Sequence, residues 1–128
     1  MVQNQSSGAS ANYWGRKTAR AIADKLGTAI TSKNSNECMY RDCKVVIKCA
    51  KFETDSVGVT YKMLERLDYV IGAFEQDESH FKLFQIPVSI YESHMRATAS
   101  KGAAKGKVGI VRQTVFEEHG VSLGSLTI

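Results

Sequence analysis

This chain lacks the features that define membrane-spanning and secreted proteins. Its longest apolar run is far shorter than the roughly 20 residues of a membrane helix, and no basic, apolar leader opens it. Its three cysteines, Cys38, Cys43 and Cys49, are odd in number and crowded into one short stretch. This pattern argues against a disulfide framework and favours a reducing compartment. We therefore expect a cytoplasmic protein without a membrane segment.

Acidic residues are missing from two parts of the chain. Residues 93–116 contain no Asp or Glu, and before Glu37 the only acid is Asp24. The bases of the acid-free segment are Arg96, Lys101, Lys105, Lys107 and Arg112. Basic flanks around an acidic centre are typical of proteins that bind polyanions. We expect these five bases to bind the nucleic-acid backbone, and an ordinary solvated surface is the alternative.

The chain is long enough for one packed domain. It has 128 residues, of which 43% are hydrophobic and 23% charged, as in ordinary globular proteins. Residues 1–11 are uncharged and rich in Ser, Gly, Ala, Asn and Gln, which predicts a disordered lead before a single globular domain at 12–128.

The predicted elements alternate between helices and strands. They are a helix capped by Asn12, a hairpin at 37–51, a helix at about 59–67, a hairpin at 69–86, a helix at 89–98, a strand at 108–112 and a helix from Thr114. This order predicts a mixed α/β (α+β) fold, with a central mixed sheet flanked by helices.

The hairpin at 37–51 is the most informative stretch. Arg41 and Asp42 predict a tight turn, and the apolar residues 45–47 predict a strand deep in the sheet. Lys48 follows this apolar run directly. A lysine within a buried strand is costly to desolvate unless it meets an anion. We therefore expect the chemistry of the protein here, although Lys48 could also reach solvent from an edge strand.

The hairpin and its surroundings resemble the PD-(D/E)XK nuclease superfamily, which has the restriction-endonuclease-like fold. The resemblance covers roughly the first half of the chain: a leading helix, an acid at or before a hairpin, a core strand with a lysine, and a further helix. In that family, an acid on the first strand and an acid-x-lysine on the next hold the metal and the water. The resemblance implies Glu37 or Asp42 as the first acid and Lys48 as the lysine.

The sequence departs from the family pattern at one position. Val46 stands two residues before Lys48, where the family has an acid. Some members of the superfamily supply the missing acid from the following helix, which implies Glu65, or else Asp55 or Glu53.

The resemblance implies a metal-dependent endonuclease that hydrolyses DNA. Lys48, Glu37 and Asp42 would be its catalytic residues, and Mg²⁺ its cofactor. Its metal ligands would be Glu37, Asp42 and Glu65. A nucleic-acid-binding module without catalysis is the alternative that Val46 favours.

A third alternative is a protein-interaction or assembly domain that pairs through an exposed strand at 108–111. A chain this short could not easily enclose a duplex alone, so we also expect a homodimer or a larger complex.

Overall fold

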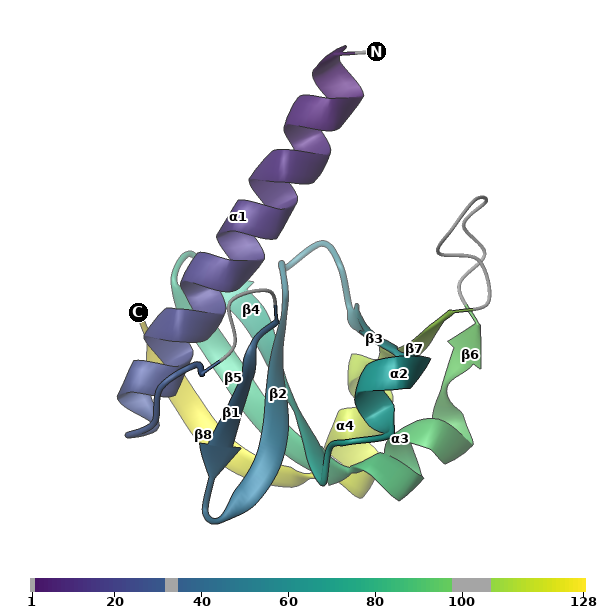
Figure 1. Ribbon diagram of the computed structural model, residues 1–128. Coiled ribbons are helices and arrows are strands. Elements are labelled where there is room, and N and C mark those ends of the chain that lie inside the picture. Colours follow the sequence, from purple (N-terminus) through teal and green to yellow (C-terminus); the bar gives the residue numbers. More distant parts are fainter. Residues whose placement is uncertain (1, 32–34, 98–106) are drawn as a thin grey trace.

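The structure of the chain is a computed structural model (Figure 1), which describes residues 2–31, 35–97 and 107–128, with side chains from Tyr13 onward. The elements are α1 (Val2–Lys25), β1 (Glu37–Tyr40), β2 (Cys43–Ala50), β3 (Ser56–Thr60), α2 (Tyr61–Leu64), β4 (Tyr69–Asp77), β5 (His80–Pro87), α3 (Val88–His94), β6 (Arg96–Ala97), β7 (Val108–Arg112), α4 (Gln113–His119) and β8 (Val121–Thr127). In the described part of the chain, no helix is long and apolar enough to cross a membrane.

The strands form two sheets. The larger sheet has five strands in the order β1-β2-β4-β5-β8, and the smaller one has three in the order β3-β7-β6. β2 and β4 pair in parallel, whereas the other pairs are antiparallel. The helix α1 crosses one face of the larger sheet. The smaller sheet and the helices α2, α3 and α4 lie on the opposite face of the larger sheet (Figure 1). The predicted fold class, with a mixed central sheet flanked by helices, is confirmed.

Two hydrophobic cores lie on the two faces of the larger sheet. Val45 and Ile47 of β2 pack in the core that includes Ile22 of α1, whereas Val46 packs in the other core with Phe116 of α4. All five side chains are fully buried. Because successive residues of a strand point to opposite faces, the continuous apolar run of β2 supplies both cores.

The helix α1 packs as its four-residue spacing predicts. Ile22 is fully buried and Thr18 is 4% exposed, while Trp14 and Leu26 are partly buried against the same core. The helix begins at Val2, however, ahead of the predicted cap at Asn12. No proline interrupts residues 2–11, so the helical backbone can continue through them. The division into a lead at 1–11 and one domain at 12–128 stays a prediction.

Several predictions of local structure are wrong. In place of the predicted helix at 59–67, the structure has the end of the strand β3 followed by the four-residue helix α2. The strand-like alternation and the helical spacing of this segment therefore each correspond to an element. The helix α4 begins at Gln113, which places Thr114 inside it instead of at its cap. The strands β6 and β8 were not predicted. β7 lies between β3 and β6, so residues 108–111 do not offer the free edge that the assembly alternative requires.

Candidate nucleic-acid interface and hairpin site

The predicted hairpin is confirmed, and its lysine lies on an inner strand. Arg41 and Asp42 both adopt positive φ angles, 51° and 66°, which suit the tight turns that join antiparallel strands. β2 lies between β1 and β4, so Lys48 does not stand on an edge strand. The alternative that Lys48 reaches solvent from an edge is therefore wrong.

Glu37 and Lys48 share one face of the sheet. Glu37 pairs with Val46, and Lys48 is two residues further along β2. Paired residues and residues two apart on a strand point to the same face. The hairpin therefore places an acid and a lysine on one face, with the fully buried Val46 at the position of the missing acid.

The Glu37 carboxylate is neutralised by Arg66. Arg66 donates from Nε to Oε1 at 2.8 Å and from its terminal nitrogen to Oε2 at 2.7 Å, and Ser35 also donates to this carboxylate. These hydrogen bonds, with that from Arg66 the strongest cause, hold the pKa of Glu37 below its ordinary value. Lys44 adds a smaller effect through its charge. Glu37 is thus a satisfied ion-pair partner.

Lys48 is partly buried beside a glycine. Burial lowers the pKa of its amine, because a charged group is poorly solvated there. No hydrogen bond or ion pair joins Lys48 to the residues that the structure describes. Its partner in register is Gly72, where a Cβ would come within 2.7 Å of Phe74 and 2.8 Å of Phe116. Aromatic packing therefore requires the glycine beside the lysine.

The other two predicted metal ligands lie elsewhere. Asp42 occupies the turn that follows β1, whereas Glu37 is at the other end of that strand. Glu65 lines a hollow of about 510 Å³ beside α2, whereas Glu37 lines a different hollow of about 210 Å³ with Lys44 and Arg66. The structure does not bring these three acids together.

The acids, histidines and cysteines of the chain all fall within the described ranges. No three of these side chains gather where they could hold a metal ion. The residues present therefore do not fit a Mg²⁺ ion held by three side chains of one chain.

The cysteines have no partner thiols. Cys38, Cys43 and Cys49 are free. Burial raises the pKa of Cys38, and it raises the pKa of Cys49 to about 12. Because the thiolate is the reactive form, these two cysteines serve as small core residues.

Three of the five predicted nucleic-acid-binding residues lie in or next to the paired strands β6 and β7. Arg96 of β6 pairs with Ile110, and Arg112 is two residues further along β7, so both arginines point to the outer face of the smaller sheet. Lys107 directly precedes β7. All three side chains are exposed. We call Arg96, Lys107 and Arg112 the basic surface; the predicted residues Lys101 and Lys105 lie outside the described residues.

The basic surface continues into the hollow beside α2. Lys107 lines this hollow with Tyr61 and Lys62, and its carbonyl accepts a hydrogen bond of 3.0 Å from the Tyr61 amide. The Tyr61 side chain is 37% exposed. Sequence reasoning missed Tyr61 and Lys62, because their segment was interpreted as one face of a longer helix. Their adjacency, an aromatic next to a base, was the available signal.

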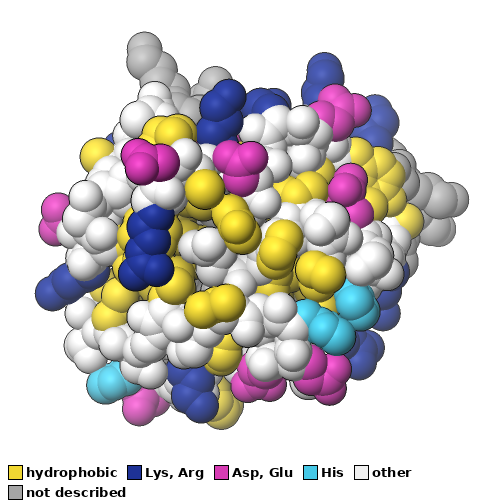
Figure 2. All heavy atoms as spheres, turned by 90° about the horizontal axis from the view of Figure 1, so that it is seen from below, with side chains coloured by type: hydrophobic (Ala, Val, Ile, Leu, Met, Phe, Trp, Pro, Cys, Tyr) yellow, Lys and Arg dark blue, Asp and Glu magenta, His cyan; other side chains and the backbone are white. Residues whose placement is uncertain are grey.

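In the described structure no acid forms an ion pair with the basic surface, although Glu65 lines the same hollow as Lys107. The ion pair in the described residues joins Arg66 to Glu37, and two further contacts, His80 with Asp77 and His119 with Glu118, are ion pairs only when the histidine is protonated. By contrast, the face seen from below carries acidic and basic side chains interspersed with apolar ones (Figure 2).

Comparisons with known proteins find similarity among solved structures. No family model matches the chain, and no curated protein matches it. Among solved structures, the 1.6 Å structure of Archaeoglobus fulgidus Hjc, a Holliday junction resolvase from an archaeal hyperthermophile, is similar with 12% sequence identity and a TM-score of 0.49. The match covers 85% of this chain and 91% of that chain. A TM-score below 0.5 assigns neither a family nor an activity to this chain.

Proposed function

We propose that this chain binds the phosphate backbone of DNA through the basic surface. The observation that carries the proposal is the position of Arg96 and Arg112 on the outer face of the smaller sheet, with Lys107 leading into the same strand. Exposed Lys and Arg side chains neutralise phosphates and release counterions, which gives affinity without reading sequence. Tyr61, at the edge of this surface, offers an aromatic ring to the same ligand.

The test measures the affinity of the protein for a labelled DNA duplex at fixed, low salt. The double variant Arg96→Ala/Arg112→Ala is compared with wild type and with Lys82→Ala, an exposed lysine on β5. We expect the double variant to bind about tenfold or more weakly, since each phosphate contact adds affinity, and the control to bind like wild type. Equal affinity of all three proteins would contradict the proposal.

Metal-dependent DNA cleavage is the second candidate function. The observation that favours it is the shared face of Glu37 and Lys48 on adjacent strands. Against it stand the ion pair of Glu37 with Arg66 and the buried Val46. A nicking assay on supercoiled plasmid with Mg²⁺, Mn²⁺ or EDTA tests it. Cleavage that requires the metal and is lost in Lys48→Ala and Glu37→Ala would make this the function of the hairpin.

We also propose that the protein acts in the cytoplasm and as a homodimer. The support for both is the sequence: three cysteines free of disulfides, and a chain too small to surround a duplex by itself. Light scattering at working concentration would measure the oligomeric state.

A further inference from the structure

The helix α1 presents a second basic stripe, away from the basic surface. Tyr13, Arg16, Lys17 and Arg20 follow one another at helical spacings of three, one and three residues, so they lie on one side of the helix. The opposite side carries Ala19, Ile22 and Ala23, which are fully buried against the larger sheet. We call the four residues from Tyr13 to Arg20 the α1 stripe.

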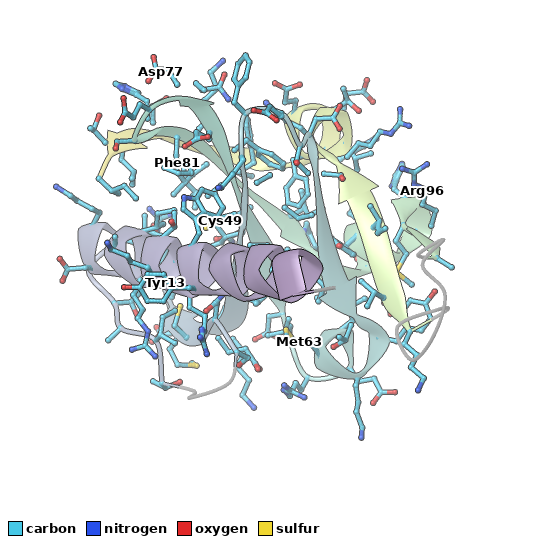
Figure 3. All side chains as sticks on the ribbon, turned by 90° about the horizontal axis from the view of Figure 1, so that it is seen from above. Tyr13, Cys49, Met63, Asp77, Phe81 and Arg96 are labelled. Carbon is cyan, nitrogen blue, oxygen red and sulfur yellow. The ribbon has the colours of Figure 1, made fainter. Side chains whose placement is uncertain are left out.

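The α1 stripe lies far from the basic surface. Viewed from above, Tyr13 lies beside α1, while Arg96 lies at the opposite side of the molecule (Figure 3). The larger sheet separates α1 from the elements around the smaller sheet (Figure 1). The two basic regions therefore cannot contact one phosphate group.

The side chains of the α1 stripe surround a shallow hollow, and the ring of Tyr13 is exposed to solvent. The four side chains line a shallow hollow of about 350 Å³. The Tyr13 side chain is 62% exposed, and the Lys17 ammonium lies over its ring at 6.0 Å from the centroid. A tyrosine left this exposed gains little from packing, so its ring is available to a ligand.

The α1 stripe carries three bases and no acid. Arg16, Lys17 and Arg20 form no ion pair with any described acid, and Asp24, four residues after Arg20, is the one acid in the sequence of α1. Like charges three and four residues apart on a helix repel each other and destabilise it. A polyanion that binds the stripe would remove this repulsion.

We infer that the α1 stripe binds single-stranded nucleic acid. Tyr13 stacks on an unpaired base, and Arg16, Lys17 and Arg20 bind the adjoining phosphates. The stripe spans seven residue steps, about 10 Å of helix, which suits a short backbone segment beside one stacked base. A single strand fits better than a duplex, because only an unpaired base exposes its face to an aromatic ring. The inference does not depend on the basic surface, since the two regions share no residue.

The experiment measures the anisotropy of a fluorescent oligothymidylate and of a blunt duplex with the full chain. Its variants are Tyr13→Ala, Tyr13→Phe and Arg16→Ala/Arg20→Ala. Lys25→Ala is the matched control, because Lys25 is exposed on the same helix and lies outside the stripe. Thermal melting of every variant confirms that it is folded.

The inference predicts a selective loss of single-strand affinity. Tyr13→Ala should weaken binding of the single strand about tenfold, which is within the range for the loss of a stacking aromatic. Tyr13→Phe keeps the ring and should bind the single strand like wild type. The double arginine variant should weaken it at least as much and flatten its salt dependence. Duplex affinity should change little, and Lys25→Ala should match wild type.

Three results would overturn the inference. They are unchanged single-strand binding in both the Tyr13→Ala and arginine variants, an equal loss for Tyr13→Phe and Tyr13→Ala, and an equal loss for duplex and single strand. Failure of the basic surface would appear instead as unchanged duplex affinity in Arg96→Ala/Arg112→Ala, so the two proposals fail separately.

Discussion

The hairpin and the basic surface carry charged residues in very different settings. In the hairpin, Arg66 neutralises Glu37, and burial disfavours the charge of Lys48. On the basic surface, Arg96 and Arg112 are exposed, with no acid of the described structure paired to them. Charged residues are thus paired or partly buried in one region and exposed to a ligand in the other. The predictions below test this difference, from the largest expected effect to the smallest.

The largest effect should come from an acid placed at the core of the hairpin. Val46→Asp puts a carboxylate at a fully buried position among apolar side chains, and we expect it to cost roughly 4 kcal/mol of unfolding free energy. Urea unfolding measures the loss. The control Val46→Ala should cost about 2 kcal/mol for the cavity alone, so the remaining loss in Val46→Asp is the cost of the charge. If Val46→Asp were as stable as Val46→Ala, the Lys48 amine would be compensating the new charge, and the hairpin would tolerate the family's acid.

Replacing the partly buried lysine should stabilise the protein. Lys48→Met removes an amine whose charge is disfavoured by burial and keeps much of its volume, so we expect a gain of about 1 kcal/mol at neutral pH. The folded-state pKa lies below the unfolded value, so the stability advantage of Lys48→Met over wild type should shrink as the pH increases toward 10.5. A loss of stability in Lys48→Met would show that the amine has an anionic partner in the folded protein.

The ion pair of Glu37 should make a smaller contribution that disappears in acid. Its pKa is lower in the folded chain than the ordinary value of 4.5, so ionised Glu37 stabilises the fold above that value. The advantage of wild type over Glu37→Gln should therefore be present at neutral pH and be lost as the pH falls through the folded pKa. Chemical unfolding at several pH values measures it. A constant difference across this range would contradict the role given to the pair.

The smallest effect should come from the basic surface itself. Arg112→Ala and Arg96→Ala should each change the unfolding free energy by no more than about 0.5 kcal/mol, because these exposed side chains contribute no described ion pair to the fold. Thermal or urea unfolding measures this, with Val46→Ala as the reference for a core position. A loss approaching that of Val46→Ala would mean that the arginines are structural.

The sequence predicted the elements whose patterns are strong and local. The buried run of β2, the turn at Arg41 and Asp42, and the hairpin of β4 and β5 each depend on neighbouring residues, and all three are confirmed. The split of β3 from α2 was missed because the alternation of Val57 and Val59 overlaps a helical spacing that begins at Tyr61. β8 was missed because its polar and glycine residues lack a clear strand pattern. Its strand structure depends on its pairing with β5.

The candidate site was predicted less completely than the fold. Periodicity correctly placed Lys48 in a buried strand, but the partner of Glu37 is Arg66, which lies 29 residues away along the chain. The stacking of His94 against His119, at 4.5 Å between ring centroids, was missed for the same reason. Tertiary pairing of this kind depends on how separate elements pack, and no spacing in the sequence encodes it.

The salt dependence of DNA binding tests the central claim most directly. The logarithm of the association constant for a duplex is measured against the logarithm of salt concentration, for wild type, Arg96→Ala/Arg112→Ala and Lys82→Ala. If the two arginines contact phosphates, the slope of the double variant should be shallower than that of wild type by roughly 2, with Lys82→Ala unchanged. A double variant that keeps the wild-type slope and affinity would contradict the account.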